Sequence, residues 1–321
     1  MRGEVLAGLI GAAANIVIDT NVPITDAGRL FKSIGWRFYI GPLIKKVNNY
    51  IRERLKDMGK GDFVWVDKGV FIEPDILSEI KNAGAFLVHY TPDTAFAHNR
   101  SGLFFRGLPY YDACITTKSF ELLDYEKAGS QKTIFCTQGY NPNLHQPLHS
   151  FAEKKGICFI GLAEPNRLHI LSKLIEAGFP VKIGGYGWSK LSKKYSGMEN
   201  FTFLGERIFG EDYVQAISSS LLALGLLSKR FPELHTTRTF EIPACGTALI
   251  TEDNKEIRQF YGEDEVLYFH DHDDLVEKIQ YYLNNINQLQ ILTQKGTEKM
   301  RTGKYDYPSI LKNILVQLDV V

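Results

Sequence analysis

The sequence contains few cysteines, no excess of charge of either sign and no long apolar run. Its four cysteines lie far apart among 321 residues and show neither CxxC nor Cys/His spacing, which excludes a disulfide framework and a thiolate metal site. The 37 Lys and Arg are matched by 37 Asp and Glu, so no overall field attracts nucleic acid or an anionic membrane. No apolar run reaches the length of a transmembrane helix.

The first 18 residues, MRGEVLAGLIGAAANIVI, have some features of a secretory signal peptide. Glu4 and glycines interrupt their apolar run, however, and the following DTNVPIT is typical of the end of a strand inside a fold. The isolated cysteines also fit a reducing compartment. We therefore expect a cytoplasmic protein with no integral membrane segment and no nucleic-acid partner.

Short, β-rich apolar runs alternate with longer amphipathic stretches along the first half of the chain. Helical patterns such as LIKKVNNYIRERLKDMG and PDILSEIKNAG, the latter ending at Gly84, separate these runs. This alternation predicts an α/β fold with a parallel sheet covered on both faces. The strands predicted in this half are residues 15–19, 62–67, 85–90, 113–117 and 132–139.

The same alternation begins again after a polar segment with two prolines, NPNLHQPLHSFAEKKG. We therefore predict two Rossmann-like, doubly wound domains facing a cleft, 1–150 and 151–305, with a hinge near residue 150. An amphipathic helix in the last stretch, 306–321, is expected to pack back on the first domain. The strands predicted in the second half are residues 156–161, 180–185, 201–205, 220–225, 247–251 and 265–269.

The segment PELHTTRTFEIPACG places Arg238 and Glu241 one helical turn apart, between a predicted strand and a glycine. Thr236 or Thr237 can cap the helix N-terminus, where free N–H groups favour a phosphate. Arg238 can add a bidentate phosphate contact, and Glu241 can accept hydrogen bonds from ribose hydroxyls. Spacing alone favours the alternative, a solvated salt bridge on a surface helix.

The segment RTFEIPACGTALITEDNKEIRQFYG and the helix pattern that follows it resemble the donor-binding region of GT-B glycosyltransferases, in the CgeB-like (spore-maturation-protein-like) branch of the group 1 transferases. FVWVDKGVFIEPDILSEIKNAGAFLVHYTPDTAF and YYDACITTKSFELLDYEKAGSQKTIFCTQGYNPNLHQP resemble the same family in order and spacing. The resemblance covers residues 28–305. It implies a metal-independent transferase that uses a nucleoside diphosphate sugar as donor substrate and needs no cofactor.

The resemblance assigns site residues in the second domain. Glu241 matches the glutamate that holds the nucleotide ribose, and Glu233 matches an acidic position that faces the donor sugar. The loop FIGLAEPNR supplies Gly161, for close backbone approach, and Arg167, which reaches a phosphate or is an exposed arginine at a helix start. The loop GGYGW supplies Gly185 and Tyr186 as a wall of the base pocket, with a plain glycine turn as the alternative.

In the first domain, VHYTPDTAFAHNRSG follows a strand end and brings His89, Asp93, His98 and Arg100 toward the acceptor. Asp93 is the candidate for a general base or for a group that orients the acceptor hydroxyl, with His89 behind it. The alternative is a turn role for Asp93 after Pro92 and a core position for His89.

HDHDD, residues 270–274, has the composition of a metal site. It directly precedes an amphipathic helix, so Asp273 or Asp274 as an N-cap explains it without a metal. No further ligand has the spacing that would complete a site, and we expect no metal.

The chain departs from the family pattern at its start. GT-B chains open with a strand and a glycine-rich loop, whereas RGEVLAGLIGAA has the pattern of the first helix, leading into NIVID as a second strand. A sheet without its first strand leaves unpaired backbone beside a core. We expect a hexosyltransferase whose acceptor is a glycan, a lipid-linked sugar or a protein. The alternatives are a binding protein without turnover and a sugar-nucleotide epimerase.

Overall fold

In a computed structural model of the chain, which describes residues 2–97 and 99–321, the chain divides into two compact units. Unit 1 comprises Met1–Thr137 with Leu311–Val321, and unit 2 comprises Gln138–Ile310. The polar segment in which the domain boundary is expected, 141–156, lies inside unit 2.

Unit 1 contains, within the described residues, a parallel sheet whose strands follow one another in sequence order, β1-β2-β3-β4. Its strands are β1 (Phe63–Asp67), β2 (Phe86–Thr91), β3 (Ala113–Thr116) and β4 (Thr133–Phe135). Its helices are α1 (Arg2–Ile10), α2 (Asn21–Thr25), α3 (Arg29–Phe38), α4 (Pro42–Arg54), α5 (Pro74–Asn82), α6 (Gly102–Gly107), α7 (Leu122–Lys127) and α15 (Tyr307–Gln317), the last of which belongs to unit 1 from Leu311 on.

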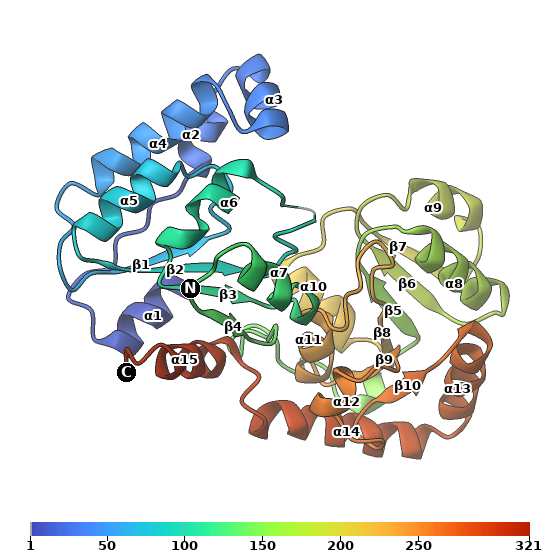
Figure 1. Cartoon of the computed structure of the whole chain (residues 1–321). Helices are drawn as coiled ribbons and strands as arrows, with labels where there is room; N and C mark the ends of the chain where they lie inside the picture. Colours follow the sequence, from blue (N-terminus) through green and yellow to red (C-terminus); the bar gives the residue numbers. More distant parts are fainter. Residues whose placement is uncertain (1, 98) are drawn as a thin grey trace. The chain divides into compact units, whose positions relative to one another are not determined.

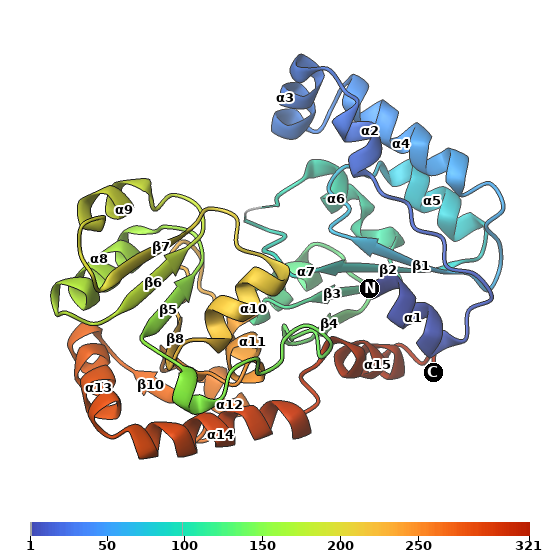
Figure 2. The same cartoon turned by 180° about the vertical axis from the view of Figure 1, so that it is seen from behind.

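When each strand is added on the same side of the previous one, the right-handed crossover connections place their helices on one face of the sheet. Figures 1 and 2 show α5 and α6 on that face of unit 1, with α1 and the C-terminal part of α15 on the other. Side chains of β2 point alternately to these two faces. Leu87 belongs to the main core of the unit. Tyr90 points to the other face, where the Arg2 guanidinium of α1 lies 4.3 Å from the centroid of its ring. The second face of this sheet is therefore covered by the two ends of the chain.

Four of the five strands predicted in the first half are confirmed, and one is wrong. Residues 15–19 form no strand, and Ile16 and Val17 are 73% and 74% exposed. A β-branched run needs a partner strand and a buried face, and this segment has neither. The sheet consequently begins at β1, an edge strand in which Phe63, Val64 and Trp65 are only partly buried.

Unit 2 contains, in the part of the chain that is described, a six-stranded parallel sheet of order β10-β9-β8-β5-β6-β7. All six strands predicted in this half are present. They are β5 (Ile157–Ile160), β6 (Val181–Gly184), β7 (Phe201–Gly205), β8 (Leu222–Gly225), β9 (Ala248–Glu252) and β10 (Leu267–Phe269). The helices are α8 (Pro165–Glu176), α9 (Ser189–Tyr195), α10 (Gly210–Ser218), α11 (Arg238–Ala244), α12 (Ile257–Phe260), α13 (His272–Asn284) and α14 (Ile286–Thr302).

The strand order of unit 2 reverses between β5 and β8, which distributes helices over both faces. Ile157 and Phe159 point into one core with α8, α9 and α13, while Cys158 and Ile160 point into a second core with α10, α11 and α12. In such sheets the crevice for a ligand lies outside the carboxyl ends of the two strands at the reversal. In unit 2 these ends are Ile160–Gly161 and Gly225–Leu226.

Candidate functional site

Two arginines meet at the carboxyl ends of β5 and β8. Arg238, the first residue of α11, donates from Nη1 to the Ile160 carbonyl at 3.2 Å and from Nη2 to the Leu226 carbonyl at 3.1 Å. Arg167, on the first turn of α8, donates from Nη2 to the same Leu226 carbonyl at 3.0 Å. The Phe159 ring lies beneath both guanidinium groups, 5.5 Å from that of Arg238 and 5.6 Å from that of Arg167. The strand reversal therefore gathers two fixed positive charges.

Carboxylates balance this charge unevenly. Glu164 lies 3.1 Å from the Arg167 guanidinium, and the charges of Glu233 and Glu252 also reach Arg167. Burial, together with the neighbouring charge of Arg238, nevertheless lowers the pKa of Arg167 to about 10. The Nε atoms of both arginines have no hydrogen-bond partner among the described residues. Like charges held together with unused donors are typical of a site that receives an anion.

Glycines allow the close approach on which this arrangement depends. A Cβ on Gly161 would lie 3.2 Å from Nη1 of Arg238 and 2.9 Å from the Phe159 ring. Gly185 has a φ of +117°, and a Cβ there would lie 2.2 Å from the Gly161 carbonyl oxygen. The Trp188 indole donates to that same oxygen at 2.7 Å. The loops after β5 and β6 are thus packed against each other through their backbones.

Glu241 lies one turn beyond Arg238 on α11, and 14% of its side chain is exposed. The Tyr213 hydroxyl donates to its Oε2 at 2.9 Å, and the Thr237 side chain also hydrogen-bonds to the carboxylate. Burial raises the pKa of Glu241, while these hydrogen bonds and the charge of Arg238 oppose the rise. Its second oxygen lies 3.9 Å from Nε2 of His145.

Thr237 occupies the predicted N-cap position, but its role differs from the prediction. Its backbone is in the right-handed helical region and its side chain does not cap α11, because the hydroxyl bonds Glu241 instead. Gly246, with a φ of +71°, follows the last residues of the helix as predicted.

The loop before α11 carries Glu233 and is anchored by a buried pair. His235 bonds Glu256 through Nδ1, and its Nε2 accepts a hydrogen bond from the Gln138 N–H at 3.0 Å. This pattern places the imidazole proton on Nδ1. Tyr186, the other predicted wall residue, is 41% exposed and accepts a hydrogen bond from Arg207 at 2.8 Å.

The predicted residues of unit 1 have contrasting environments. Asp93 follows β2, is partly exposed and forms an ion pair of 2.5 Å with Lys68, which follows β1. His89 lies inside the core, 1% exposed, with its ring 4.6 Å from that of Phe104. Burial lowers its pKa to about 4, and its Nε2 donates to the Lys68 carbonyl. This position argues against the catalytic role predicted for His89, because a core side chain does not reach a substrate. His98 lies outside the described residues.

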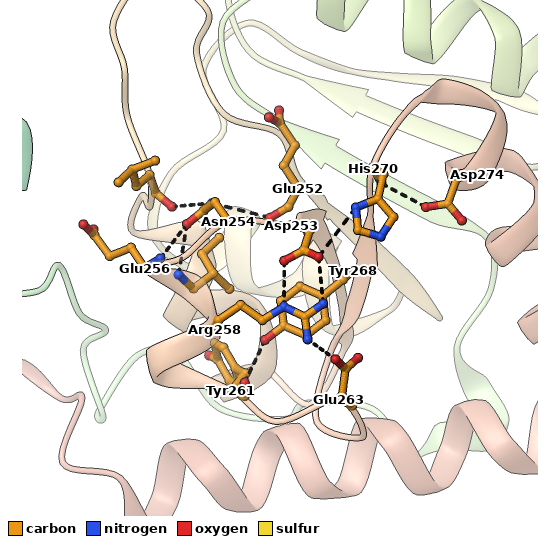
Figure 3. A network of polar contacts seen from close by, with 12 residues as sticks. Glu252, Asp253, Asn254, Glu256, Arg258, Tyr261, Glu263, Tyr268, His270 and Asp274 are labelled. Atoms are coloured by element: carbon orange, nitrogen blue, oxygen red, sulfur yellow. Dashed lines mark hydrogen bonds and ion pairs between the residues drawn. The ribbon is translucent and has the colours of Figure 1, made fainter.

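The HDHDD segment serves helix α13. Asp271, rather than the predicted Asp273 or Asp274, is the N-cap: its side chain accepts from the backbone N–H groups of both, at 2.9 Å. Figure 3 shows the surrounding network, in which Asp253 binds Arg258 with both oxygens and His270 lies 3.5 Å from Asp253. Among the described residues, no three or more His, Cys, Asp or Glu side chains lie close enough together to hold a metal ion.

Sequence reasoning missed Glu164, Tyr213 and His145. Glu164 has a local signal, since it lies three residues before Arg167 at the start of the same helix. Tyr213 comes from α10 and His145 from a loop before β5, so no spacing in the sequence connects either of them with Glu241.

A family model matches part of the second half of the chain. Residues 167–316, slightly less than half of the chain, match the family model described as glycosyl transferase-like. This region contains Arg167, Glu233, Arg238 and Glu241 but excludes the whole sheet of unit 1. No curated protein gives a significant match to the sequence.

Solved structures with a similar fold cover most of the chain. HepE from Anabaena, in complex with UDP-glucose, has a TM-score of 0.64 at 15% identity, over 99% of this chain and 96% of that one. Sucrose-phosphate synthase from Thermosynechococcus elongatus has a TM-score of 0.62 at 14% identity, over 86% and 77%. The α,α-trehalose 6-phosphate synthase from Burkholderia multivorans has a TM-score of 0.60 at 9% identity, over 87% and 75%. The predicted GT-B architecture is thereby confirmed.

Proposed function

We propose that the protein is a metal-independent glycosyltransferase that moves a hexose from a nucleoside diphosphate sugar to an acceptor hydroxyl. The observation that supports this most is the pair of guanidinium groups at the strand reversal of unit 2, with a carboxylate one helical turn away. A diphosphate needs fixed positive charge, and a ribose needs an acceptor for its hydroxyls. Both are present on adjoining turns of the same site.

The arginines supply the electrostatic part of the mechanism. As the glycosidic bond to the donor breaks, negative charge develops on the diphosphate leaving group, and Arg238 and Arg167 stabilise it without having to move into place. Guanidinium groups can in this way take the role that a divalent cation has in other phosphate sites. The proposal of metal independence rests on this substitution.

The carboxylates divide the binding of the donor between them. Glu241 accepts hydrogen bonds from the ribose hydroxyls, for which its ionised form is required; the Tyr213 and Thr237 hydroxyls stabilise that form. Glu233 faces the sugar, and Gly185 and Tyr186 border the base. Asp93 is the candidate for the general base or for the residue that orients the acceptor hydroxyl, because it is exposed at a strand end.

Two finer assignments accompany the proposal. The RTFEIPACG segment supports the CgeB-like branch, since it contains Arg238, Glu241 and the Gly246 that ends the helix. The four cysteines are buried and unpaired, which supports a reducing compartment such as the cytoplasm. None of the described helices is long and apolar enough to cross a membrane.

The test is stabilisation of the protein by a panel of UDP-, GDP-, ADP-, CMP- and dTDP-sugars. A ligand at a hundred times its Kd adds about 2.7 kcal/mol to the free energy of unfolding. We expect a shift with one nucleotide class, and UDP-sugars come first because of the HepE complex. Glu241→Ala should abolish this shift, while Glu277→Ala, at an exposed position on α13, should retain it.

Absence of a shift with every nucleotide would contradict the donor site. Once the donor is known, the products distinguish a transferase from its alternatives. A glycoside is expected, whereas an epimerised donor indicates an epimerase, and binding without any product indicates a protein that binds without turnover.

A further inference from the structure

The segment 29–56, which contains α3 and α4, is strongly basic in a chain whose overall charge is balanced. It carries eight Lys and Arg and one acidic residue, Glu53. Lys46, Arg52 and Arg54 have ion-pair partners. The other five basic residues of the segment form no ion pair with any described residue, so their charge is uncompensated: Arg29, Lys32, Arg37, Lys45 and Lys56.

Helix α3 turns an apolar side toward solvent. Leu30, Ile34 and Phe38 follow one another at intervals of four residues and therefore share one side of the helix. Leu30 and Phe38 are 69% and 58% exposed. Arg29, Ser33 and Arg37 form the adjacent row by the same spacing. We use the name α3 patch for the exposed apolar residues of this helix and its C-terminal end, which are Leu30, Phe31, Trp36, Phe38 and Ile40.

The exposure of the α3 patch does not come from a loosely attached helix. Gly35 lies against Leu43 of α4 so closely that a Cβ on it would be 2.5 Å from Leu43 Cδ2. The Trp36 ring meets Phe71 edge to face at 4.6 Å. Figures 1 and 2 show α3 at the outer end of the helical layer of unit 1, beside α2 and α4. These contacts hold α3 in place, although all five residues of the α3 patch remain exposed.

We infer that the α3 patch and the basic residues of the same helix, Arg29, Lys32 and Arg37, bind the surface of an anionic lipid bilayer. A helix that presents Trp, Phe and Leu together with Lys and Arg lies in the interface of a membrane, with its aromatic side chains at the level of the headgroups. Juxtamembrane Lys and Arg are attracted by the negative surface potential of anionic lipids. The bilayer is the more suitable occupant because the basic residues beside the patch have no ion-pair partner among the described residues, and an anionic surface supplies many negative charges at once.

This inference goes beyond the proposed function and does not depend on it, since the patch lies in unit 1 and its test measures binding to vesicles. It also favours the lipid-linked acceptor among those expected, because a bound enzyme meets its acceptor at the membrane surface.

The test is sedimentation of the full chain with vesicles of phosphatidylcholine alone and of phosphatidylcholine with one third phosphatidylglycerol. We expect binding to the anionic vesicles and at least tenfold weaker binding to the neutral ones. The double variant Phe31→Ser/Phe38→Ser should lower the partition coefficient at least tenfold, because both rings lose their burial in the headgroup region. Arg29→Gln/Arg37→Gln should lower it several-fold, and salt at 0.5 M should do the same to the wild type.

Matched variants elsewhere serve as controls. Phe209→Ser removes a phenylalanine in unit 2 that is 69% exposed, and Lys190→Gln/Lys193→Gln removes two exposed charges of α9. Both should bind vesicles like the wild type. A blue shift of tryptophan emission on adding anionic vesicles, lost in Trp36→Phe, would place the patch itself in the headgroup region.

Three results would overturn the inference. The first is equal binding of the wild type and of Phe31→Ser/Phe38→Ser to anionic vesicles, and the second is no binding by the wild type. The third is a dimer of the wild type that Phe31→Ser/Phe38→Ser dissociates, because the patch would then be an interface between two copies of the chain. Circular dichroism and thermal unfolding of the double variant serve to check that it is folded.

Discussion

In unit 2, strand β5 lies between β6 and β8 with both faces covered, whereas in unit 1 strand β1 is an edge and only partly buried. Both sheets are parallel and arise from the same alternation of strands and helices. The reversal of strand order in unit 2 brings Arg167 and Arg238 together at the carboxyl ends of β5 and β8. The sequential order in unit 1 provides no reversal within its described strands, and its candidate Asp93 lies beside Lys68 at an exposed strand end.

The comparison extends to charge and apolar surface. Unit 2 buries the ion pair of Arg167 and Glu164 at its strand reversal. Both groups lose their hydration on burial, which lowers the free energy gained by folding, so such a pair is more typical of a functional site than of a stabilising contact. Unit 1 exposes the apolar residues of the α3 patch instead. In each unit, one of the departures from the usual distribution of residues therefore coincides with a proposed binding surface.

The largest effect is expected from Arg238→Met, which tests whether the arginine pair at the strand reversal of unit 2 acts in catalysis. Removing one of two charges that stabilise the leaving group should lower the transfer rate about a thousandfold. The stability of the fold should change little, because the substitution also removes the charge that repels Arg167. Steady-state kinetics and thermal unfolding measure both effects. The exposed Arg301→Met should match the wild type, and equal activity of Arg238→Met would refute the role.

The next effect concerns the backbone contact between the loops after β5 and β6, beside the arginine pair. Gly185→Ala should lower the free energy of unfolding by about 3 kcal/mol, because its Cβ would clash with the Gly161 carbonyl at a φ that side chains disfavour. Gly178→Ala is the matched control: its φ is +86°, but no atom lies within 4 Å of the added carbon, so it should cost about 1 kcal/mol. Denaturant unfolding measures the two, and equal losses would show that the contact with Gly161 is not limiting.

A third prediction asks whether unit 1 contributes chemistry at its strand end. Asp93→Asn should lower kcat about a hundredfold, since the amide cannot accept the acceptor proton. The stabilisation by the donor should stay unchanged, because donor binding is assigned to unit 2. The exposed Asp124→Asn on α7 serves as control. An unchanged kcat for Asp93→Asn would leave Asp93 with a turn role only.

The smallest expected effect is on the pH dependence of stability, to which one buried histidine in each unit contributes. Burial lowers the pKa of both His89 and His145 to about 4, below the value in the unfolded chain. As the pH falls below about 6.5 the unfolded chain therefore binds protons first, so each residue's contribution to stability is present at neutral pH and is lost toward pH 4. From pH 7 to pH 5, fully buried His89 alone should account for a loss of about 2 kcal/mol.

His89→Gln should remove this part of the pH dependence while keeping an amide donor for the Lys68 carbonyl. Denaturant unfolding of wild type and variant at pH 7 and pH 5 measures the difference, with the exposed His169→Gln as control. Transfer activity of His89→Gln close to that of the wild type would agree with a core position. Loss of activity in a folded variant would restore the catalytic assignment.

The sequence alone determined all the strands of both sheets, because buried parallel strands are short apolar runs bounded by turn residues. It also predicted one strand, 15–19, that does not form. It pointed as well to Arg238, which the structure places at the strand reversal, because Arg238 lies in a local motif with Glu241 and Gly246. The net charge, in contrast, gave no sign of the basic segment 29–56, because a net charge of zero does not show how the charges are distributed along the chain.

Only the tertiary structure decided which distant groups meet. Arg167 and Arg238 lie 71 positions apart in the sequence and share one carbonyl because the strand order reverses between β5 and β8. Tyr213 reaches Glu241 from another helix, and His89 proves to be a core residue because the face of β2 that carries it packs on α6. Residues 15–19 show the converse, since β propensity makes a strand only where a partner edge is in place. Local patterns specify elements, and the packing of those elements specifies the site.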